Sequence, residues 1–361
     1  MGAATASRPG YASGVSDRRP NSRLSRLRPA QLAQRPWLRA GLLAFAAGLA
    51  VYGLASQWTE VHAALAKLAV YDVAGAALSV IAGLGGMLMA WRALLADLGS
   101  PLPLPAAIRV MFIGQLGKYV PGAVWALAAQ VELARDYDVP RRRSATASLV
   151  GMATTLVVGL IAAGVMLPLT SGHAVRHYWW VLAITPLAAV CLYPKIIEFG
   201  LNLALRVIRQ PPLEESVSGA GMARALGWTT LGWLCFGAHA WFLISVFAGK
   251  SPHVFALSLG GYALAWAVGF LIIFFPGGIG PREIALVAVL APVMSSASAL
   301  VVALASRVVM TIGDLFWAGI GLLIGRVRPS AAAPDPEPLS GVSALTEPAG
   351  NQPSPVRDPR P

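Results

Sequence analysis

The stretch "GKYVPG", residues 117–122, lies inside a long apolar segment and combines a lysine, a proline and two glycines. Proline removes a backbone donor and clashes with the preceding helical turn, and glycine adopts backbone conformations that other residues avoid. Pro121 and Gly122 therefore predict a bend rather than a continuous helix. Much later in the chain, "FFPGGIGPRE" (274–283) combines prolines and glycines again, followed by a charged pair.

The composition around these bends is that of an integral membrane protein. Hydrophobic residues make up 56% of the 361 residues and charged residues 12%, whereas soluble domains carry about a quarter charged residues. The net charge of +12 lies mostly outside the apolar segments, and no basic fold with interleaved aromatics argues for a nucleic-acid partner. The two cysteines and five histidines show no metal-ligand spacing, so we expect no metal and no cofactor.

Three regions follow from the distribution of polar residues. Residues 1–36 are rich in Arg, Ser, Pro and Gly, and residues 329–361 are rich in Pro, so we expect both to be disordered tails. Residues 37–328 form the expected membrane domain. Its apolar segments are 38–56, 73–91, 106–134, 144–168, 178–194, 225–248, 254–275, 284–295 and 298–325. Most reach the roughly 20 residues that cross the hydrocarbon core.

The basic loops set an expected orientation, because Lys and Arg concentrate on the cytoplasmic side. The Arg-rich N-terminus, the loop 135–143 and the flank 325–329 are then cytoplasmic, in a cell-membrane protein with both termini inside. Segment 106–134 must enter and leave on that face, whereas 254–295 starts and finishes outside. We therefore expect an all-α polytopic membrane protein with two broken or re-entrant helical hairpins in an inverted repeat, as in secondary transporters.

The first bend carries one basic residue at depth. Lys118 could supply a cation to an anionic headgroup; alternatively, Lys118 and Tyr119 anchor a helix end at the interface by snorkelling. Glu132 follows on the returning arm. We favour a surface ion pair with Arg135, three residues later, over a role in the transport path.

The second bend and the last apolar segment carry four further charges. Glu283 lies in the first turn after the bend, where it either caps the helix or forms a functional ionisable pair with Arg282. Arg307 and Asp314 are seven residues apart and share one helical face. Arg307 could bind a phosphate through two hydrogen bonds, or pair with Glu283 and lock two helices together. His239 is expected to be a hydrogen-bonded packing residue.

Two motifs carry a family resemblance. "GQLGKYVPGAVW" (114–125) and "FFPGGIGPREIALVAVL" (274–290) resemble the lysylphosphatidylglycerol synthase transmembrane-domain family, also described as flippase-like, over most of residues 38–325. In those synthases the module is fused to a soluble aminoacyl-transferase domain and moves the modified lipid to the outer leaflet. Only the tail follows Gly325 here, so the resemblance implies transport without aminoacyl transfer. The matching positions are Lys118, Pro121, Gly122, Pro276, Gly277, Gly278, Gly280, Arg282 and Glu283.

The leading hypothesis is a non-enzymatic, flippase-like transporter of an anionic or head-group-modified lipid. An aminoacylated phospholipid and a polyprenyl-phosphate-linked sugar are the candidate substrates. Lys118, Arg282 and Arg307 would hold the phosphate. Charge balance or relay would fall to Glu132, Glu283 and Asp314.

Two rival functions remain open. A membrane-embedded, polyprenyl-dependent glycosyltransferase needs carboxylates at the membrane surface, and the first external loop offers only Glu60 and Asp72, without a paired acidic motif. An accessory subunit of a cell-envelope synthase would use the basic tails to dock anionic lipids or the enzyme. The expected partners are therefore membrane lipids and, under this last hypothesis, an envelope-synthesis enzyme.

Overall fold

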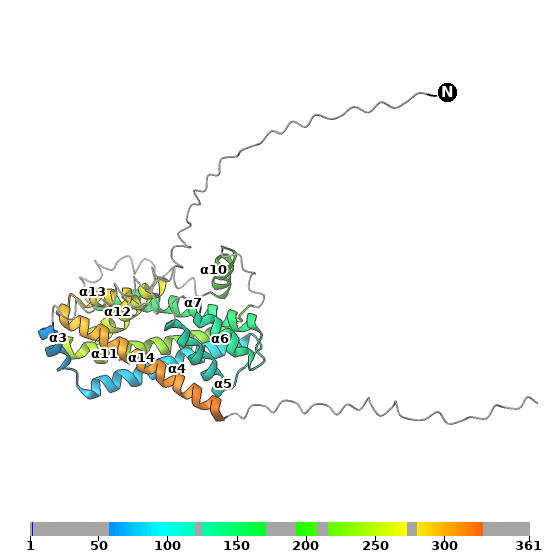
Figure 1. Ribbon diagram of the computed structural model, residues 1–361. Coiled ribbons are helices and arrows are strands. Elements are labelled where there is room, and N and C mark those ends of the chain that lie inside the picture. Colours follow the sequence, from blue (N-terminus) through cyan, green and yellow to red (C-terminus); the bar gives the residue numbers. More distant parts are fainter. Residues whose placement is uncertain are drawn as a thin grey trace, which may run out of the picture. The chain divides into compact units, whose positions relative to one another are not determined.

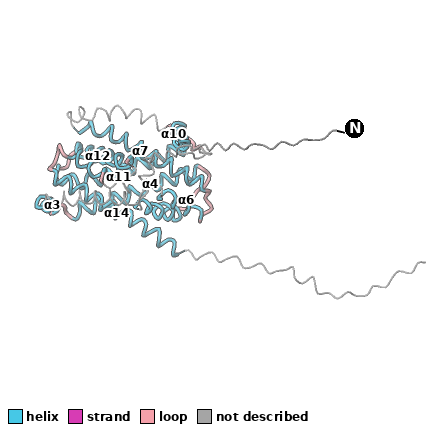
Figure 2. The backbone as a smooth tube through the Cα atoms, turned by 45° about the horizontal axis from the view of Figure 1, so that its top comes forward, coloured by secondary structure: helices cyan, strands magenta, loops and turns pink. Residues whose placement is uncertain are grey.

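The computed structural model describes residue 2 and residues 58–119, 125–170, 193–207, 216–272 and 280–327. The predicted tails, the first apolar segment, most of the fifth, and the bend residues Pro121, Gly122, Pro276, Gly277 and Gly278 lie outside the described residues. Every described element is a helix (Figure 2). The elements are α3 (Trp58–Leu65), α4 (Val70–Asp97), α5 (Leu104–Ile108), η1 (Arg109–Ile113), η2 (Leu116–Tyr119), α6 (Trp125–Arg135), α7 (Arg141–Met166), η3 (Leu167–Thr170), α10 (Pro194–Val207), α11 (Gly219–Ala248), α12 (Pro252–Leu271), α13 (Pro281–Leu290) and α14 (Ser296–Val327).

Within the described residues, five helices are long and apolar enough to cross a membrane: α4, α7 with η3, α11, α12 and α14. Figure 1 shows them packed together, with α11 between α4 and α12. Each contains or overlaps an apolar segment that the sequence predicts. The prediction of an all-α, multi-pass membrane protein is therefore confirmed.

Helices α3 and α10 lie where the sequence indicates loops. The short helix α3 places Val61 and Ala64 in a small buried cluster with Ala297 and Val301 of α14. In α10, Ile197 is buried and packs into the main core. Both helices are too short to form a membrane-length apolar run, so hydropathy alone does not reveal them.

Helices α4 and α11 make the most extensive contact among the described helices, and this contact depends on glycine. A Cβ atom at Gly86 would lie 3.1 Å from both the Cα and the N of Gly232, so the two backbones touch. Small residues permit such contacts between membrane helices. At the end of this pair, the carboxylate of Asp97 accepts hydrogen bonds from the backbone N–H and the hydroxyl of Ser218, each at 2.7 Å. Asp97 thus holds the N-terminus of α11, a contact that the sequence did not indicate.

The first bend joins two closely packed arms. A Cβ at Gly114 would lie 2.8 Å from the Cα of Gln130, and one at Gly117 would lie 2.8 Å from the N of Ala126. Because the earlier glycine faces the later residue of α6, the arms run antiparallel and form a hairpin. Its re-entrant position in a membrane stays a prediction.

Replacing Gly114 by alanine tests this packing. Because the two nearest atoms that it would meet are backbone atoms of Gln130, we expect Gly114→Ala to lower the free energy of unfolding by about 1–3 kcal/mol, as overpacking does. Thermal unfolding of the purified protein in detergent measures the effect. Gly227→Ala in α11 is the matched control, since no atom lies within 4 Å of the added carbon. A Gly114→Ala protein as stable as the control would contradict the hairpin contact.

The second bend joins α12 to α13. A Cβ at Gly261 would lie 2.8 Å from Cγ1 of Val289, so the two helices lie side by side. Helix α13 has 10 residues, about 15 Å at 1.5 Å per residue, too short to cross a membrane. It packs in turn against α14. The inverted relation between the two hairpins stays a prediction.

Candidate functional site

Helix α14 carries two charged side chains within its membrane-length segment, Ser296–Ile324. Arg307 and Asp314 are seven residues apart, about 10.5 Å along the axis, and share one face of the helix. Each is paired with a residue from one of the two bends. Lys118 of η2 pairs with Asp314, and Glu283 of α13 pairs with Arg307. The two bends therefore meet the same helix.

The Lys118–Asp314 pair is short and partly buried. The Nζ of Lys118 lies 2.6 Å from Oδ2 of Asp314, and the side chains are 31% and 6% exposed. The snorkelling alternative did not include this partner, which is a buried carboxylate on a helix far from Lys118 in the sequence. The side chain of Tyr119 lies outside the described residues.

Glu283 caps α13, one of the two roles that the sequence left open, and also pairs with a charge on α14. Its Oε2 accepts a hydrogen bond of 2.7 Å from the backbone N–H of Gly280 and so caps α13. Its Oε1 lies 3.6 Å from Nη1 of Arg307. Gly280 has φ +95°, a backbone conformation that residues other than glycine rarely adopt. The final glycine of the second motif thus sets the start of α13 and the position of Glu283.

Arg282 is buried in the helix bundle, where it contacts Tyr262 of α12. Its guanidinium carbon lies 4.7 Å from the centroid of the Tyr262 ring, and one nitrogen donates a hydrogen bond to the Tyr262 hydroxyl. Tyr262 is fully buried in α12. A cation held against an aromatic face gains electrostatic stabilisation. The sequence did not single out Tyr262, although it is the single tyrosine of the apolar helix α12.

His239 of α11 contacts residues of both α12 and α14. Its ring lies 4.5 Å from that of Tyr262, and its Nε2 lies 3.0 Å from the hydroxyl of Ser306, the neighbour of Arg307. Its Nδ1 contacts the carbonyl of Phe236. His239 is thus the hydrogen-bonded packing residue that the sequence predicts. Helices α11, α12, α13 and α14 are joined by these polar contacts.

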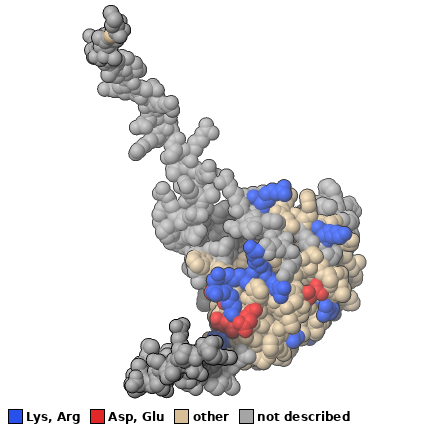
Figure 3. Space-filling view, turned by 90° about the vertical axis from the view of Figure 1, so that its right-hand side faces the viewer, with Lys and Arg blue, Asp and Glu red and all other residues tan. Residues whose placement is uncertain are grey.

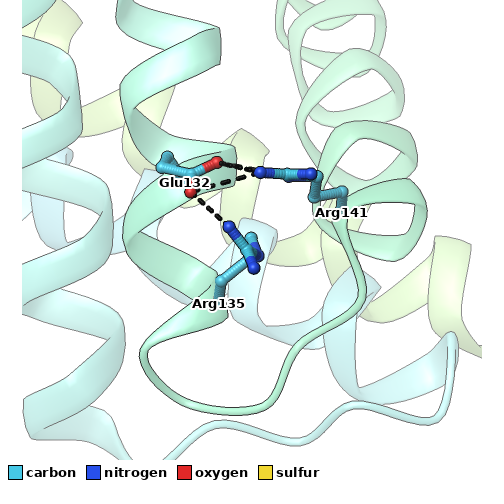
Figure 4. Close-up of polar contacts among 3 residues, drawn as sticks. All are labelled: Glu132, Arg135 and Arg141. Carbon is cyan, nitrogen blue, oxygen red and sulfur yellow. Dashed lines mark hydrogen bonds and ion pairs between the residues drawn. The ribbon is translucent and has the colours of Figure 1, made fainter.

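Glu132 lies elsewhere, in an exposed cluster between α6 and α7 (Figure 4). Its carboxylate accepts hydrogen bonds from Arg135 at 2.5 Å and from Arg141 at 3.0 Å. These two bonds, that from Arg135 first, lower the pKa of Glu132 below its ordinary value. The favoured surface pair with Arg135 is confirmed. Such exposed pairs contribute little to stability because water and salt screen them.

One end of the bundle gathers the basic loops. Arg143 at the start of α7 donates a hydrogen bond of 3.0 Å to the carbonyl of Gly99, after α4. Asp97, two residues before Gly99, holds the start of α11. Its Oδ1 lies 3.4 Å from Nη2 of Arg224. Figure 3 shows Lys and Arg side chains spread over one face of the molecule, with acidic groups among them. We call the end of the bundle that carries Arg143 and Arg224 the basic end.

Among the described residues, no group of three or more His, Cys, Asp and Glu side chains is placed to hold a metal ion. A sequence model of the family described as "Lysylphosphatidylglycerol synthase TM region" matches residues 38–318. The match includes both bends and all four residues of the two ion pairs on α14. No curated protein matches the chain.

Proposed function

Because the chain belongs to the lysylphosphatidylglycerol synthase transmembrane-region family, we propose that it moves an anionic or head-group-modified lipid between the two leaflets. The family makes it a membrane protein related to lipid modification or transport. Flippase activity, the cell membrane as its location and cytoplasmic termini are parts of the proposal.

The observation that carries the proposal is the pair of ion pairs on α14. Ionised groups within a membrane-spanning segment are costly and usually face a partner, a cavity or a transport path. Here each of the two bends supplies one partner, Lys118 or Glu283, to the same helical face. Lys118, Arg282 and Arg307 provide the cations that a phosphate requires, and arginine can bind two of its oxygens at once.

The flank of α14 provides an apolar surface that is compatible with a lipid substrate. Val308, Ile312 and Leu315 are exposed along this helix, beside the face that carries Arg307 and Asp314. A phospholipid has the matching two parts, because its acyl chains favour an apolar surface and its phosphate favours cations. The proposed path therefore runs along α14, with acyl chains on the exposed flank and the headgroup at the ion pairs.

The remaining candidate residues have separate roles in this proposal. The bend residues Pro121, Gly122, Pro276, Gly277 and Gly278 would supply the turns that let the hairpins open alternately to each leaflet. Glu132 belongs to the exposed cluster with Arg135 and Arg141, outside the path.

Leaflet exchange in proteoliposomes tests the proposal. We expect the purified protein to accelerate exchange of short-chain labelled phosphatidylglycerol, lysylphosphatidylglycerol or a polyprenyl-phosphate sugar. A neutral glycosyl diacylglycerol of equal chain length, which has no phosphate, should exchange at the protein-free rate. If a folded protein moves none of these lipids, the glycosyltransferase and accessory-subunit hypotheses gain weight. Equal acceleration of all of them would indicate bilayer perturbation rather than transport.

A further inference from the structure

The carboxylate of Asp314 is bound to the ammonium group of Lys118, one of the cations proposed to hold the lipid phosphate. Its Oδ2 lies 2.6 Å from the ammonium nitrogen, within the range of a strong charge-assisted hydrogen bond. We infer that Asp314 acts as an internal substitute for the phosphate: a lipid headgroup binds Lys118 only by displacing it. This inference rests on the proposed transport function and concerns how the same site is loaded.

The two ion pairs differ in a way that selects Lys118 as the residue that moves. Glu283 is held twice, by Arg307 and by the backbone N–H of Gly280. Asp314 is buried in the body of a long helix. The ammonium group of Lys118 lies at the end of a flexible four-carbon side chain, which extends from the four-residue helix η2 and is 31% exposed. It can therefore turn from Asp314 to a headgroup with little change in the helices.

Displacement also explains why a transport site for anions contains carboxylates. A cation left at depth without a counter-charge is strongly destabilising. Asp314 compensates the charge of Lys118 while no lipid is bound, and the phosphate replaces that compensation during loading. Lys118 keeps an anionic partner throughout, but the buried Asp314 loses its cation when a lipid binds. The cost of that loss weakens lipid binding, which favours turnover over tight binding.

The inference predicts that removing the charge of Asp314 strengthens lipid binding. We expect Asp314→Asn to lower the Kd for short-chain phosphatidylglycerol about tenfold, as removal of a competing anion worth about 1.4 kcal/mol would do. Lys118→Gln should raise the Kd by a similar factor. In the Lys118→Gln background, Asp314→Asn should have no effect, because the cation for which the two anions compete is absent. Arg224→Gln, which removes an exposed cation at the basic end, is the matched control.

These Kd values are measured on the full chain in detergent. The probe is fluorescently labelled short-chain phosphatidylglycerol. Thermal unfolding establishes that each variant is folded, and Asp314→Thr repeats the test if the asparagine variant does not fold. Glycerol 3-phosphate and inorganic phosphate are added as competitors. They should displace the probe far less well than unlabelled lipid, and equal competition would overturn the assignment of a lipid as the ligand.

The possible results separate the inference from the proposed function. An Asp314→Asn protein that binds phosphatidylglycerol no better than the wild type overturns the displacement, although wild-type binding and exchange would still support transport. The displacement is also overturned if Asp314→Asn lowers the Kd for phosphatidylglycerol by the same factor in the Lys118→Gln background as in the wild type. A wild-type protein that neither binds nor exchanges any phosphate-bearing lipid overturns the proposed function itself.

Discussion

Arg307→Ala should reduce leaflet exchange of phosphatidylglycerol by about 30-fold or more, which corresponds to about 2 kcal/mol or more lost from a desolvated charge contact. The substitution removes a cation from the membrane-length segment of α14. It also leaves Glu283, whose side chain is 16% exposed, without the guanidinium that lies 3.6 Å away. The carboxylate of Glu283 that remains would repel an anionic headgroup. Both the affinity for the lipid and its rate of passage should therefore fall.

The fold should tolerate this change better than the activity does. The bond from the Gly280 N–H to Glu283 still caps α13, and α14 still packs against α3, α4, α11 and α13. We expect the variant to purify and unfold cooperatively, and Arg307→Lys to recover part of the rate because it restores the charge but not the planar fork. Arg224→Gln should exchange lipid at the wild-type rate. Normal exchange by Arg307→Ala would remove Arg307 from the path.

Gly86→Leu should be the most destabilising single substitution at the contact of α4 and α11. The added side chain would begin 3.1 Å from the Cα and N of Gly232 and from the carbonyl oxygen of Trp228, all backbone atoms. Backbone cannot rotate away as a side chain can, so the helices must separate. We expect a loss of about 3 kcal/mol or more in the free energy of unfolding, at or beyond the usual range for overpacking.

Thermal unfolding and the yield of monodisperse protein after extraction measure this loss. Gly227→Leu, on the partner helix α11 at a position with no atom within 4 Å of the added Cβ, is the matched control and should behave like the wild type. If the two leucine variants were equally stable, the close approach of α4 and α11 would be wrong.

Hydropathy and charge were enough to predict the helical membrane fold and the candidate charges. Long apolar runs identify spans such as α11, because lipid demands about 20 apolar residues in a row. The spacing of Arg307 and Asp314 places both on one face of α14, since seven residues make nearly two turns. The pairing of Arg307 with Glu283 was one of two readings, and the structure shows that pair.

Contacts between distant segments could not be predicted. Nothing near Lys118 in the sequence indicates Asp314, because their pairing depends on how η2 packs beside α14. Tyr262 and Asp97 were missed for the same reason: one is revealed by the guanidinium on its ring, the other by the helix N-terminus that it holds. The small helix α3 buries too few apolar residues for hydropathy to detect it.

The most direct test of the central claim compares initial rates of phosphatidylglycerol exchange in three matched liposome samples: wild type, Arg307→Ala and no protein. The account predicts fast exchange with the wild type and a rate near the protein-free value with the folded variant. Equal rates with the wild type and the variant would contradict a headgroup path at the α14 ion pairs, and a wild-type rate equal to that of protein-free liposomes would contradict lipid transport altogether.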